Sequence, residues 1–428
     1  MQPRFETDAF ISPITGTAGE AAITASRSAA TTATIHARWL ASVGELSRAQ
    51  WDALFAGRAE NWGYFRACER SGHDGVTTAA IAAFFGETLV AAAPLFETAY
   101  HLDMALPGPL QKAAAVLRRV APSLLKKSIV SIGSPWTEEC PIGLHPALDV
   151  DQRATAFSAL VAGMERHADA KGIALRVLKD VEDRDAEWMT PILARLGYAR
   201  APNLPVATLH LPFESEAGYL ASLSSNMRRD LKRKMRSADK VQVEICHSIA
   251  GIEDEITALF LETKARSKAE YAGFDDVPAD YFRNVIAALG DRALIVLTRV
   301  DGVLASFSIS LMEDNRVIGK YLGMRYPLAT EHNVYFINWM VIVRLCIARG
   351  IRWLQTGQTT YNQKIRLGCQ LKRSWIFFKH RGTFMAAIVR AVGGRLRFDT
   401  LDPDLKDGGA QKSYIRSDAT ASTLLEAA

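Results

Sequence analysis

A lysine follows a glycine-containing turn in the segment Gln355–Gly368 (QTGQTTYNQKIRLG). The apolar run Ile351–Thr356 indicates a strand, which ends at Gly357 and Gln358 and leads on to Lys364. A cation at the end of a strand can face the mouth of a cleft, where it would stabilise an oxyanion or contact a donor phosphate. Gly357 and Gln358 would then lie against the donor or substrate. The alternative is that Lys364 is a surface lysine in contact with solvent.

Three more polar residues lie near the ends of predicted elements. Lys320 is close to the end of the expected strand Arg316–Leu322, where it would bind donor or substrate at the cleft or remain a surface lysine. Glu313 and His332 lie on adjacent turns, and either could deprotonate an amine directly or through water. Residues of these types at such turns are more often ordinary polar loop residues, which is the alternative for both.

Positive charge is concentrated in one short segment. Between Asn226 and Lys240, seven Lys or Arg residues outnumber two Asp residues, so this segment carries +5, the net charge of the whole chain. Such a concentration favours an anionic ligand such as a phosphate, a nucleotide or RNA, although a solvated helix face is the alternative. The residues expected to bind the ligand are Arg228, Arg229, Lys232 and Arg233. Four apolar residues that would seat this helix on a lobe are Leu220, Leu223, Met227 and Leu231.

The composition narrows the class of protein. With 428 residues, 49% apolar and 23% charged, the chain suits two or three globular domains and not a disordered or fibrous protein. No apolar run is long enough for a transmembrane helix, and the N-terminus has no signal-peptide pattern. Five scattered cysteines indicate reduced thiols in the cytoplasm, and nine histidines show no metal-ligand spacing. No nucleophile elbow, Walker loop or dinucleotide-binding glycine motif occurs.

The chain contains an apparent internal duplication. The first copy has a helix at Tyr64-Phe65-Arg66, two runs (Val76–Phe85 and Thr88–Phe96) around a glycine turn, the helix Phe157–Lys171 and the strand Ile173–Leu178. The second has Tyr281-Phe282-Arg283, Ala293–Val300 and Val303–Met312, the helix Val334–Arg349 and the strand Ile351–Leu354. The tyrosine precedes the turn glycine by 22 residues in one copy and 21 in the other. Asp301-Gly302 is a strong hairpin signal, so each copy predicts antiparallel strands followed by a helix crossover.

This order of elements resembles that of the GNAT superfamily of acyltransferases, and the tandem form is similar to its FemAB-like or CelD-type branch. The resemblance covers about residues 40–385. The segments that carry it are Tyr219–Arg236 (YLASLSSNMRRDLKRKMR), Val317–Gly323 (VIGKYLG) with the helix Asn338–Gly350 behind it, and Gln355–Gly368.

The resemblance implies an α/β fold, with an α+β mixed sheet, of two tandem GNAT-like lobes joined by a basic helix. The expected parts are a disordered leader (1–35), an N-terminal lobe (36–215), the basic connecting helix (216–245), a C-terminal acyltransferase lobe (246–385) and a C-terminal segment with a flexible tail (386–428). It also implies a catalytic Tyr361 that protonates the leaving group, beside Lys364, although a packed tyrosine is the alternative.

The family's donor loop is altered in this sequence. Acetyl-CoA-dependent members hold pyrophosphate on a glycine-rich loop before a helix, but Arg325–Val334 (RYPLATEHNV) has no glycine. FemAB-like relatives include enzymes that use aminoacyl-tRNA. We therefore expect a cytoplasmic, monomeric N-acyltransferase with no bound cofactor. Its co-substrate would be acyl-CoA or aminoacyl-tRNA, its acceptor a small-molecule amine or glycan precursor, and tRNA a further partner. The alternative is a catalytically degenerate protein that binds RNA or an anionic glycan precursor.

Overall fold

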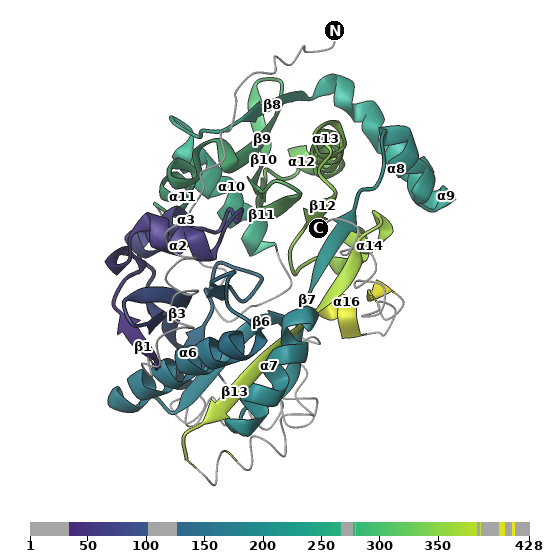
Figure 1. Cartoon of the computed structure of the whole chain (residues 1–428). Helices are drawn as coiled ribbons and strands as arrows, with labels where there is room; N and C mark the ends of the chain where they lie inside the picture. Colours follow the sequence, from purple (N-terminus) through teal and green to yellow (C-terminus); the bar gives the residue numbers. More distant parts are fainter. Residues whose placement is uncertain are drawn as a thin grey trace, which may run out of the picture.

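Strands from both halves of the chain form one sheet in the computed structural model, which describes residues 34–101, 126–266, 277–278, 280–382, 386, 402–406 and 413–415. Within these residues the hydrogen-bonded order is β1-β2-β3-β4-β6-β13-β7-β12-β11-β10-β9-β8, and the short β5 pairs with β3. The sheet is mixed and helices pack on it (Figure 1), which confirms the predicted fold class.

The strands are β1 (Ile35–Leu40), β2 (Val76–Phe85), β3 (Thr88–His101), β4 (Lys126–Ile132), β5 (Gly143–Leu144), β6 (Leu175–Glu182), β7 (Ala199–His210), β8 (Gln242–Cys246), β9 (Ala293–Val300), β10 (Val303–Met312), β11 (Arg316–Met324), β12 (Trp353–Gln355) and β13 (Gln370–His380). The helices are α2 (Arg48–Leu54), α3 (Trp62–Ser71), α6 (Val150–Ala170), α7 (Asp183–Arg195), α8 (Glu216–Ser222), α9 (Ser225–Lys234), α10 (Glu253–Ala265), α11 (Tyr281–Leu289), α12 (Leu328–Glu331), α13 (Val334–Ala348), α14 (Tyr361–Arg366) and α16 (Pro403–Lys406). Short 3-10 helices are η1 (Val43–Glu45), η3 (Met235–Lys240) and η4 (Gly290–Arg292).

Both predicted hairpins form, and their turns explain why. Asp301 and Gly302 adopt positive φ values of 49° and 80°, as a two-residue turn between twisted strands requires. In the first copy, Gly86 has a φ of 58° between β2 and β3. Each hairpin is followed by one parallel pair, β4 with β6 and β11 with β12. The helices α6 and α13 make the two crossovers, so the predicted order of elements is confirmed in both copies.

The equivalent tyrosines of the two copies meet at the contact between the halves. Helix α3 packs against α11, and the hydroxyl groups of Tyr64 and Tyr281 lie 3.1 Å apart. Both side chains are fully buried. One apolar cluster runs through this contact, from Leu40 and Trp51 in the first half to Phe307 in the second. The duplication predicted from the sequence is thus also a structural interface.

The last of the described strands, β13, lies inside the first half. β13 pairs antiparallel with β6 on one side and with β7 on the other, and β7 in turn pairs with β12. Phe377 of β13 is 1% exposed and packs among residues of α6, β6 and α7. Figure 1 shows β13 in yellow-green beside the teal β7 at the junction. The two halves therefore share strands and are not joined only by a linker.

The basic connecting segment differs from the single helix expected over 216–245. It contains two helices, α8 and α9, then η3 and the edge strand β8. Ser224 interrupts the helix because its side chain accepts the N–H of Met227 as the N-cap of α9. The predicted apolar stripe is confirmed, since Leu223, Met227 and Leu231 are buried in one cluster with residues of the C-terminal lobe and Leu220 packs against that cluster.

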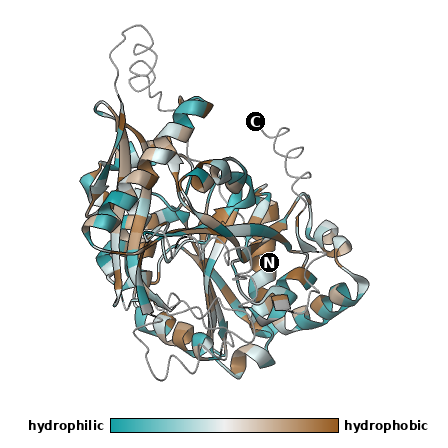
Figure 2. Ribbon diagram, turned by 90° about the horizontal axis from the view of Figure 1, so that it is seen from below, coloured by the Kyte–Doolittle hydropathy of each residue, from teal (hydrophilic) through white to brown (hydrophobic). Residues whose placement is uncertain are grey.

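The two ends of the chain lie mostly outside the described residues. The expected leader (1–35) is described only from residue 34, and Ile35 begins β1. The segment 386–428 is described at residues 386, 402–406 and 413–415 alone. Among the helices that are described, none has the length and apolarity needed to cross a membrane. Figure 2 shows helices with both brown and teal residues, as expected for helices that pack one face on a core.

Because β13 lies in the first half, truncating Phe377 should destabilise residues more than 180 positions earlier in the chain. Phe377→Ala should lower the free energy of unfolding by about 3–5 kcal/mol. Hydrogen exchange should show the loss of protection first in α6 and β6. Phe307→Ala, an equally buried change, should instead expose β9, β10 and β11. If Phe377→Ala leaves the exchange of α6 and β6 unchanged, the strand placement is wrong.

Candidate active site

β11 separates from its parallel neighbour β12 after a few residues. The two strands pair only between Arg316–Ile318 and Trp353–Gln355. On its other side β11 shifts register against β10, so that Ser310 pairs with Gly319 and Ile309 pairs with Tyr321. The residue between them, Lys320, is the extra residue of a bulge. Bulges change the direction of a side chain, and this one determines where the ammonium group of Lys320 lies.

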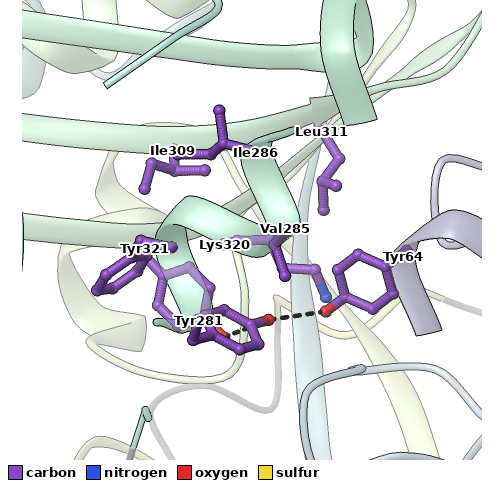
Figure 3. A pocket seen from close by; sticks show the side chains of 9 residues that line it. Tyr64, Tyr281, Val285, Ile286, Ile309, Leu311, Lys320 and Tyr321 are labelled. Atoms are coloured by element: carbon purple, nitrogen blue, oxygen red, sulfur yellow. Dashed lines mark hydrogen bonds between the residues drawn. The ribbon is translucent and has the colours of Figure 1, made fainter. Parts of the chain in front are cut away.

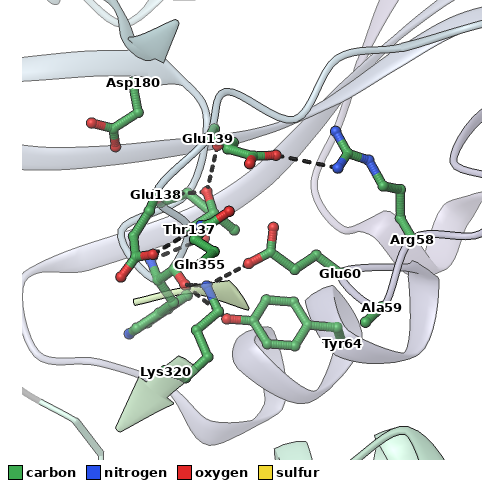
Figure 4. Close-up of polar contacts among 12 residues, drawn as sticks. Arg58, Ala59, Glu60, Tyr64, Thr137, Glu138, Glu139, Asp180, Lys320 and Gln355 are labelled. Carbon is green, nitrogen blue, oxygen red and sulfur yellow. Dashed lines mark hydrogen bonds and ion pairs between the residues drawn. The ribbon is translucent and has the colours of Figure 1, made fainter. Parts of the chain in front are cut away.

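Lys320 is buried between the two lobes. Its side chain is 4% exposed and forms an ion pair with Glu60, and its Nζ donates to the carbonyl oxygen of Trp136 at 3.0 Å (Figure 4). Burial favours the neutral amine, but the carboxylate of Glu60 outweighs this effect and raises the pKa of Lys320. The surface alternative for Lys320 does not describe the structure, because the bulge turns the side chain into the interface between the lobes.

A loop of the N-terminal lobe, Gly133–Cys140, reaches the C-terminal lobe; we call it the site loop. It follows β4 and folds back on β6, where the Nζ of Lys179 donates to the carbonyl oxygens of Ser134 at 3.0 Å and Thr137 at 2.9 Å. In the N-terminal lobe, the site loop thus fills the place next to β6 that corresponds to the gap between β11 and β12 in the C-terminal lobe. The loop carries Glu138 and Glu139 toward β11 and β12.

The predicted turn at Gly357 lies directly against Glu138. The Nε2 of Gln355 donates to Glu138 at 3.0 Å. Gly357 has a φ of 84°, and a Cβ there would be 2.8 Å from Oε1 of Glu138, so only glycine permits this contact. Gln358 donates to Asp180 of β6 at 3.2 Å, which ties the turn to the N-terminal lobe. Both predicted turn residues therefore meet side chains of the other lobe.

Lys364 lies on α14 beside the same turn. The residue is 7% exposed, and its Nζ donates to the carbonyl oxygen of Thr356. Burial lowers the pKa of Lys364 to about 8, although the carboxylate of Glu138 opposes the shift. The predicted surface alternative for Lys364 is not what the structure shows. Its amine is a buried cation near neutral pH, and the negative charge of Glu138 from the other lobe favours the protonated form.

A network of buried ion pairs surrounds this turn. Glu139 pairs with Arg316 and also with Arg58, at 3.2 Å. Burial disfavours the charge of Glu139, but the two guanidinium groups outweigh it and hold its pKa at about 2. Glu313 accepts from Arg316 at 2.8 Å and from the backbone N–H of Ala59 at 3.0 Å. Glu313, predicted as a possible base, therefore serves to join the lobes.

Tyr361 does not have the exposed hydroxyl that proton transfer to a leaving group would require. The residue is fully buried, and its hydroxyl donates to the carbonyl oxygen of Pro205 at 2.7 Å. This bond ties α14 to β7. The packed alternative considered for Tyr361 describes the structure better than the catalytic role.

A small cavity lies beside Lys320, with room for about one water molecule. Tyr64, Tyr281 and Tyr321 line it, and the hydroxyl of Tyr321 donates to that of Tyr281 at 3.0 Å (Figure 3). The other walls are apolar side chains of α11 and β10. Burial raises the pKa of all three phenols, so they are neutral hydrogen-bonding groups at ordinary pH.

The basic residues of α9 lie apart from the turn, on the surface. Arg229, Lys232 and Arg233 are exposed and Arg228 is half-buried. Arg229 donates to Asn226 and Arg233 to Asp230, both within the helix. Arg366 of α14 lies 3.7 Å from Asp230, so α9 adjoins the helix that carries Lys364. Helix α14 therefore lies between the basic residues predicted on α9 and the residues predicted around Gly357, and the two groups remain apart.

Comparison with known proteins identifies the fold. Residues 225–365 match the family described as acetyltransferase (GNAT) domain. The chain carries a GNAT acyltransferase domain. The crystal structure of FemX superposes on 81% of this chain and 98% of its own, with a TM-score of 0.55 and 12% identity. A conserved protein of unknown function from Bacteroides thetaiotaomicron covers 78% and 97%, with a TM-score of 0.50 and 10% identity.

A third structure is the C-terminal domain of a putative lysylphosphatidylglycerol synthetase from Agrobacterium fabrum. It covers 82% of this chain and 96% of its own, with a TM-score of 0.49 and 13% identity. No curated protein sequence matches the chain significantly. The domain match confirms the predicted GNAT domain and favours an acyltransferase over a protein that only binds. The likeness to FemX confirms the FemAB-like tandem fold.

The GNAT lobe has a short helix where the family's glycine loop would lie. α12 fills the segment between β11 and α13, and His332, one of the predicted bases, ends it. Arg325 donates to the carbonyl oxygen of Leu304 at 2.9 Å and pairs with Glu255 at 2.7 Å. Asn333 begins α13 with a φ of 55° and no side-chain cap. The segment that lacks glycine thus forms a short helix, α12, in place of a glycine loop.

The sequence reasoning placed the GNAT site in the C-terminal lobe and missed every residue that the N-terminal lobe contributes. These are Arg58, Glu60, Glu138 and Glu139. The only local signal was the Glu138-Glu139 pair in a segment rich in proline and glycine. Only the docking of the lobes brings this pair to the turn at Gly357.

The described residues contain no group of three side chains suited to hold a metal ion.

The ion pairs of Glu139 predict that the folded protein loses stability in acid. Glu139→Gln should lower the free energy of unfolding at pH 7 by about 3 kcal/mol, the low end for breaking a buried pair, because Glu313 still pairs with Arg316. The folded pKa is about 2, below the unfolded value of about 4.3, so this stabilisation is present above pH 4.3 and is lost as the pH falls through 2.

The difference between wild type and Glu139→Gln in urea denaturation should therefore shrink between about pH 4.3 and 2. Glu165→Gln is the control, because Glu165 pairs with Lys379 of β13 at a more exposed site. It should change the stability by less than about 1 kcal/mol. A Glu139→Gln variant as stable as wild type at pH 7 would contradict the prediction.

Proposed function

We propose that the GNAT lobe transfers an acyl group to an amine acceptor at the turn Gly357-Gln358, between Lys364 and Glu138. The observation that carries this proposal is the position of Lys364. It is a buried lysine with a pKa of about 8, and it stands beside a glycine turn that a carboxylate from the other lobe contacts. A buried cation and a carboxylate facing one another supply the two charges that acyl transfer to an amine requires.

In the proposed reaction the acceptor first binds as an ammonium group beside Glu138. The carboxylate takes one proton, and the nitrogen lone pair attacks the acyl carbonyl to form the C–N bond. The carbonyl electron pair moves to oxygen, and the ammonium of Lys364 stabilises the oxyanion. When the carbonyl re-forms, the bond to the donor sulfur or oxygen breaks, and the leaving group receives a proton from the amine nitrogen.

The donor in this proposal is acyl-CoA or aminoacyl-tRNA, both of which carry phosphates. The exposed residues of α9 would bind them, since α9 adjoins α14. The altered loop at α12 gives no reason to prefer acyl-CoA. The acceptor would be a small-molecule amine or a glycan precursor. The five unpaired cysteines suit a reducing compartment such as the cytoplasm, which remains part of the proposal.

Removing the cation should slow the chemical step. Lys364→Ala should lower kcat by about 10²–10³, the effect of losing one preorganised donor, while KM changes less. Because the protonated amine is needed and its pKa is about 8, kcat of the wild type should fall as the pH rises through 8. Steady-state kinetics from pH 6 to 10 would test both effects.

Lys364→Arg separates two roles in the same assay. A guanidinium keeps the charge but changes its geometry, so an oxyanion role should tolerate this variant poorly and a donor-phosphate role should tolerate it well. A higher KM for the donor with unchanged kcat would show that Lys364 holds phosphate. If both variants turn over like wild type, the proposed site is wrong.

Reversing charge on α9 should weaken binding of an anionic donor and leave folding intact. The double variant Arg229→Glu/Arg233→Glu should raise the Kd for tRNA or CoA at least tenfold in low salt, and the effect should shrink as salt increases. The melting temperature should change little because both side chains are exposed.

Arg283→Glu is a matched control for this variant, since Arg283 pairs with Asp280 three residues earlier as Arg233 does with Asp230. It should bind both donors like wild type. Equal affinity in all the variants would show that α9 is only a solvated face.

A further inference from the structure

Two lysines, one from each lobe, hold the backbone of the site loop. Lys179 of β6 donates to the carbonyl oxygens of Ser134 and Thr137, at 3.0 and 2.9 Å. Lys320 of β11 donates to the carbonyl oxygen of Trp136 between them, at 3.0 Å. Three carbonyl groups in four residues thus accept from ammonium groups that approach from opposite lobes. Glu138 follows the last of them directly.

Each lysine forms an ion pair with a carboxylate of its own lobe or of the other lobe. Lys179 pairs with Asp180 and is 19% exposed, whereas Lys320 pairs with Glu60 and is 4% exposed. The carbonyl bonds are therefore charge-assisted and shielded from water, which makes them stronger than ordinary hydrogen bonds. Asp180 has a φ of 57°, and it also accepts from Asn203 and Gln358, so its position beside Lys179 is itself restrained.

We propose that Lys179 and Lys320 are positioning residues that clamp the site loop and thereby hold Glu138 against Gln355 and the turn at Gly357. The inference rests on the proposed function for its catalytic meaning, but the clamp itself can be tested without any activity. It explains why a buried lysine occupies the bulge of β11, where an apolar residue would pack without requiring a partner.

The clamp has a measurable effect on Lys364. The groups that face Lys364 are Glu138 from the site loop, Asp402, Cys369 and the carbonyl oxygen of Thr356. Among them the carboxylate of Glu138 contributes most to keeping the amine protonated. If the site loop is released, Glu138 moves away and the pKa of Lys364 must fall further. A lysine that contributed only to stability would leave this pKa unchanged.

The test uses the full chain with Lys179→Met and with the double variant Lys320→Met/Glu60→Gln. The double variant avoids leaving Glu60 as a buried unpaired charge, and Glu60→Gln alone is its reference. Lys379→Met is the matched control, because Lys379 is a partly buried lysine paired with Glu165 that does not touch the site loop. Lys179→Arg, which retains a cation, should restore much of the wild-type behaviour.

Two measurements apply to every variant. Hydrogen exchange of residues 134–140 should speed up at least tenfold in Lys179→Met relative to wild type and in Lys320→Met/Glu60→Gln relative to Glu60→Gln alone, and it should remain as in wild type for Lys379→Met. The ¹³Cε resonance of Lys364, assigned by its loss in Lys364→Arg, should titrate near pH 8 in wild type and at lower pH in the clamp variants. Unchanged exchange of the loop would overturn the clamp.

Faster exchange with an unchanged Lys364 titration would overturn the positioning of Glu138, because the loop would then move without affecting the site. Neither measurement requires a donor or acceptor. Failure of the acyltransfer assays would therefore count against the proposed function, whereas these two measurements decide the clamp.

Discussion

The placement of β13 between β6 and β7 is the constraint on which the rest of this structure depends. β13 belongs to the end of the chain, yet its two neighbours belong to the first half. β7 then pairs with β12, so the sheet cannot be divided into two halves without breaking strand pairs. The lobes are held in a fixed relation by backbone hydrogen bonds, and side chains from both can form one precise site.

This fixed relation allows charged groups to be buried at the junction. Glu60, Glu139, Arg316 and Lys320 would each be unfavourable in a low-dielectric interior if unpaired. Each has an opposite charge from the other lobe within ion-pair distance. Such pairs add little to stability compared with apolar contacts, but they penalise any other docking of the lobes. Their main effect is therefore to specify geometry.

The same geometry accounts for the unequal roles of the two lobes. In the N-terminal lobe the site loop folds onto β6 and occupies the position that follows β4. In the GNAT lobe β11 and β12 separate, and the turn at Gly357 lies at this point. The N-terminal lobe thus contributes Glu138 to the proposed site in the GNAT lobe. In a duplicated fold of this kind, one copy provides the turn and α14, and the other copy provides the charged side chains that lie around them.

Local patterns were sufficient to predict the elements and their order. The hairpins at Gly86 and Asp301-Gly302, the helix that ends before Gly350, and the repeated tyrosines depend on turn chemistry and periodicity, which act over a few residues. The lysine after the Gly357 turn was identified for the same reason. The tandem α/β fold followed from that order together with the family resemblance.

The composition of the site depended on contacts between distant residues. Whether Lys320 faced a cleft or an interface was decided by a bulge in β11, and whether Tyr361 was exposed was decided by the carbonyl group of Pro205. Glu138 meets Gly357 only because the lobes dock through shared strands. Periodicity indicates which face of an element is buried, but it does not say which residue of another element covers that face. The sequence therefore determined the elements and one lysine of the proposed site, and the tertiary structure determined the partners of that lysine.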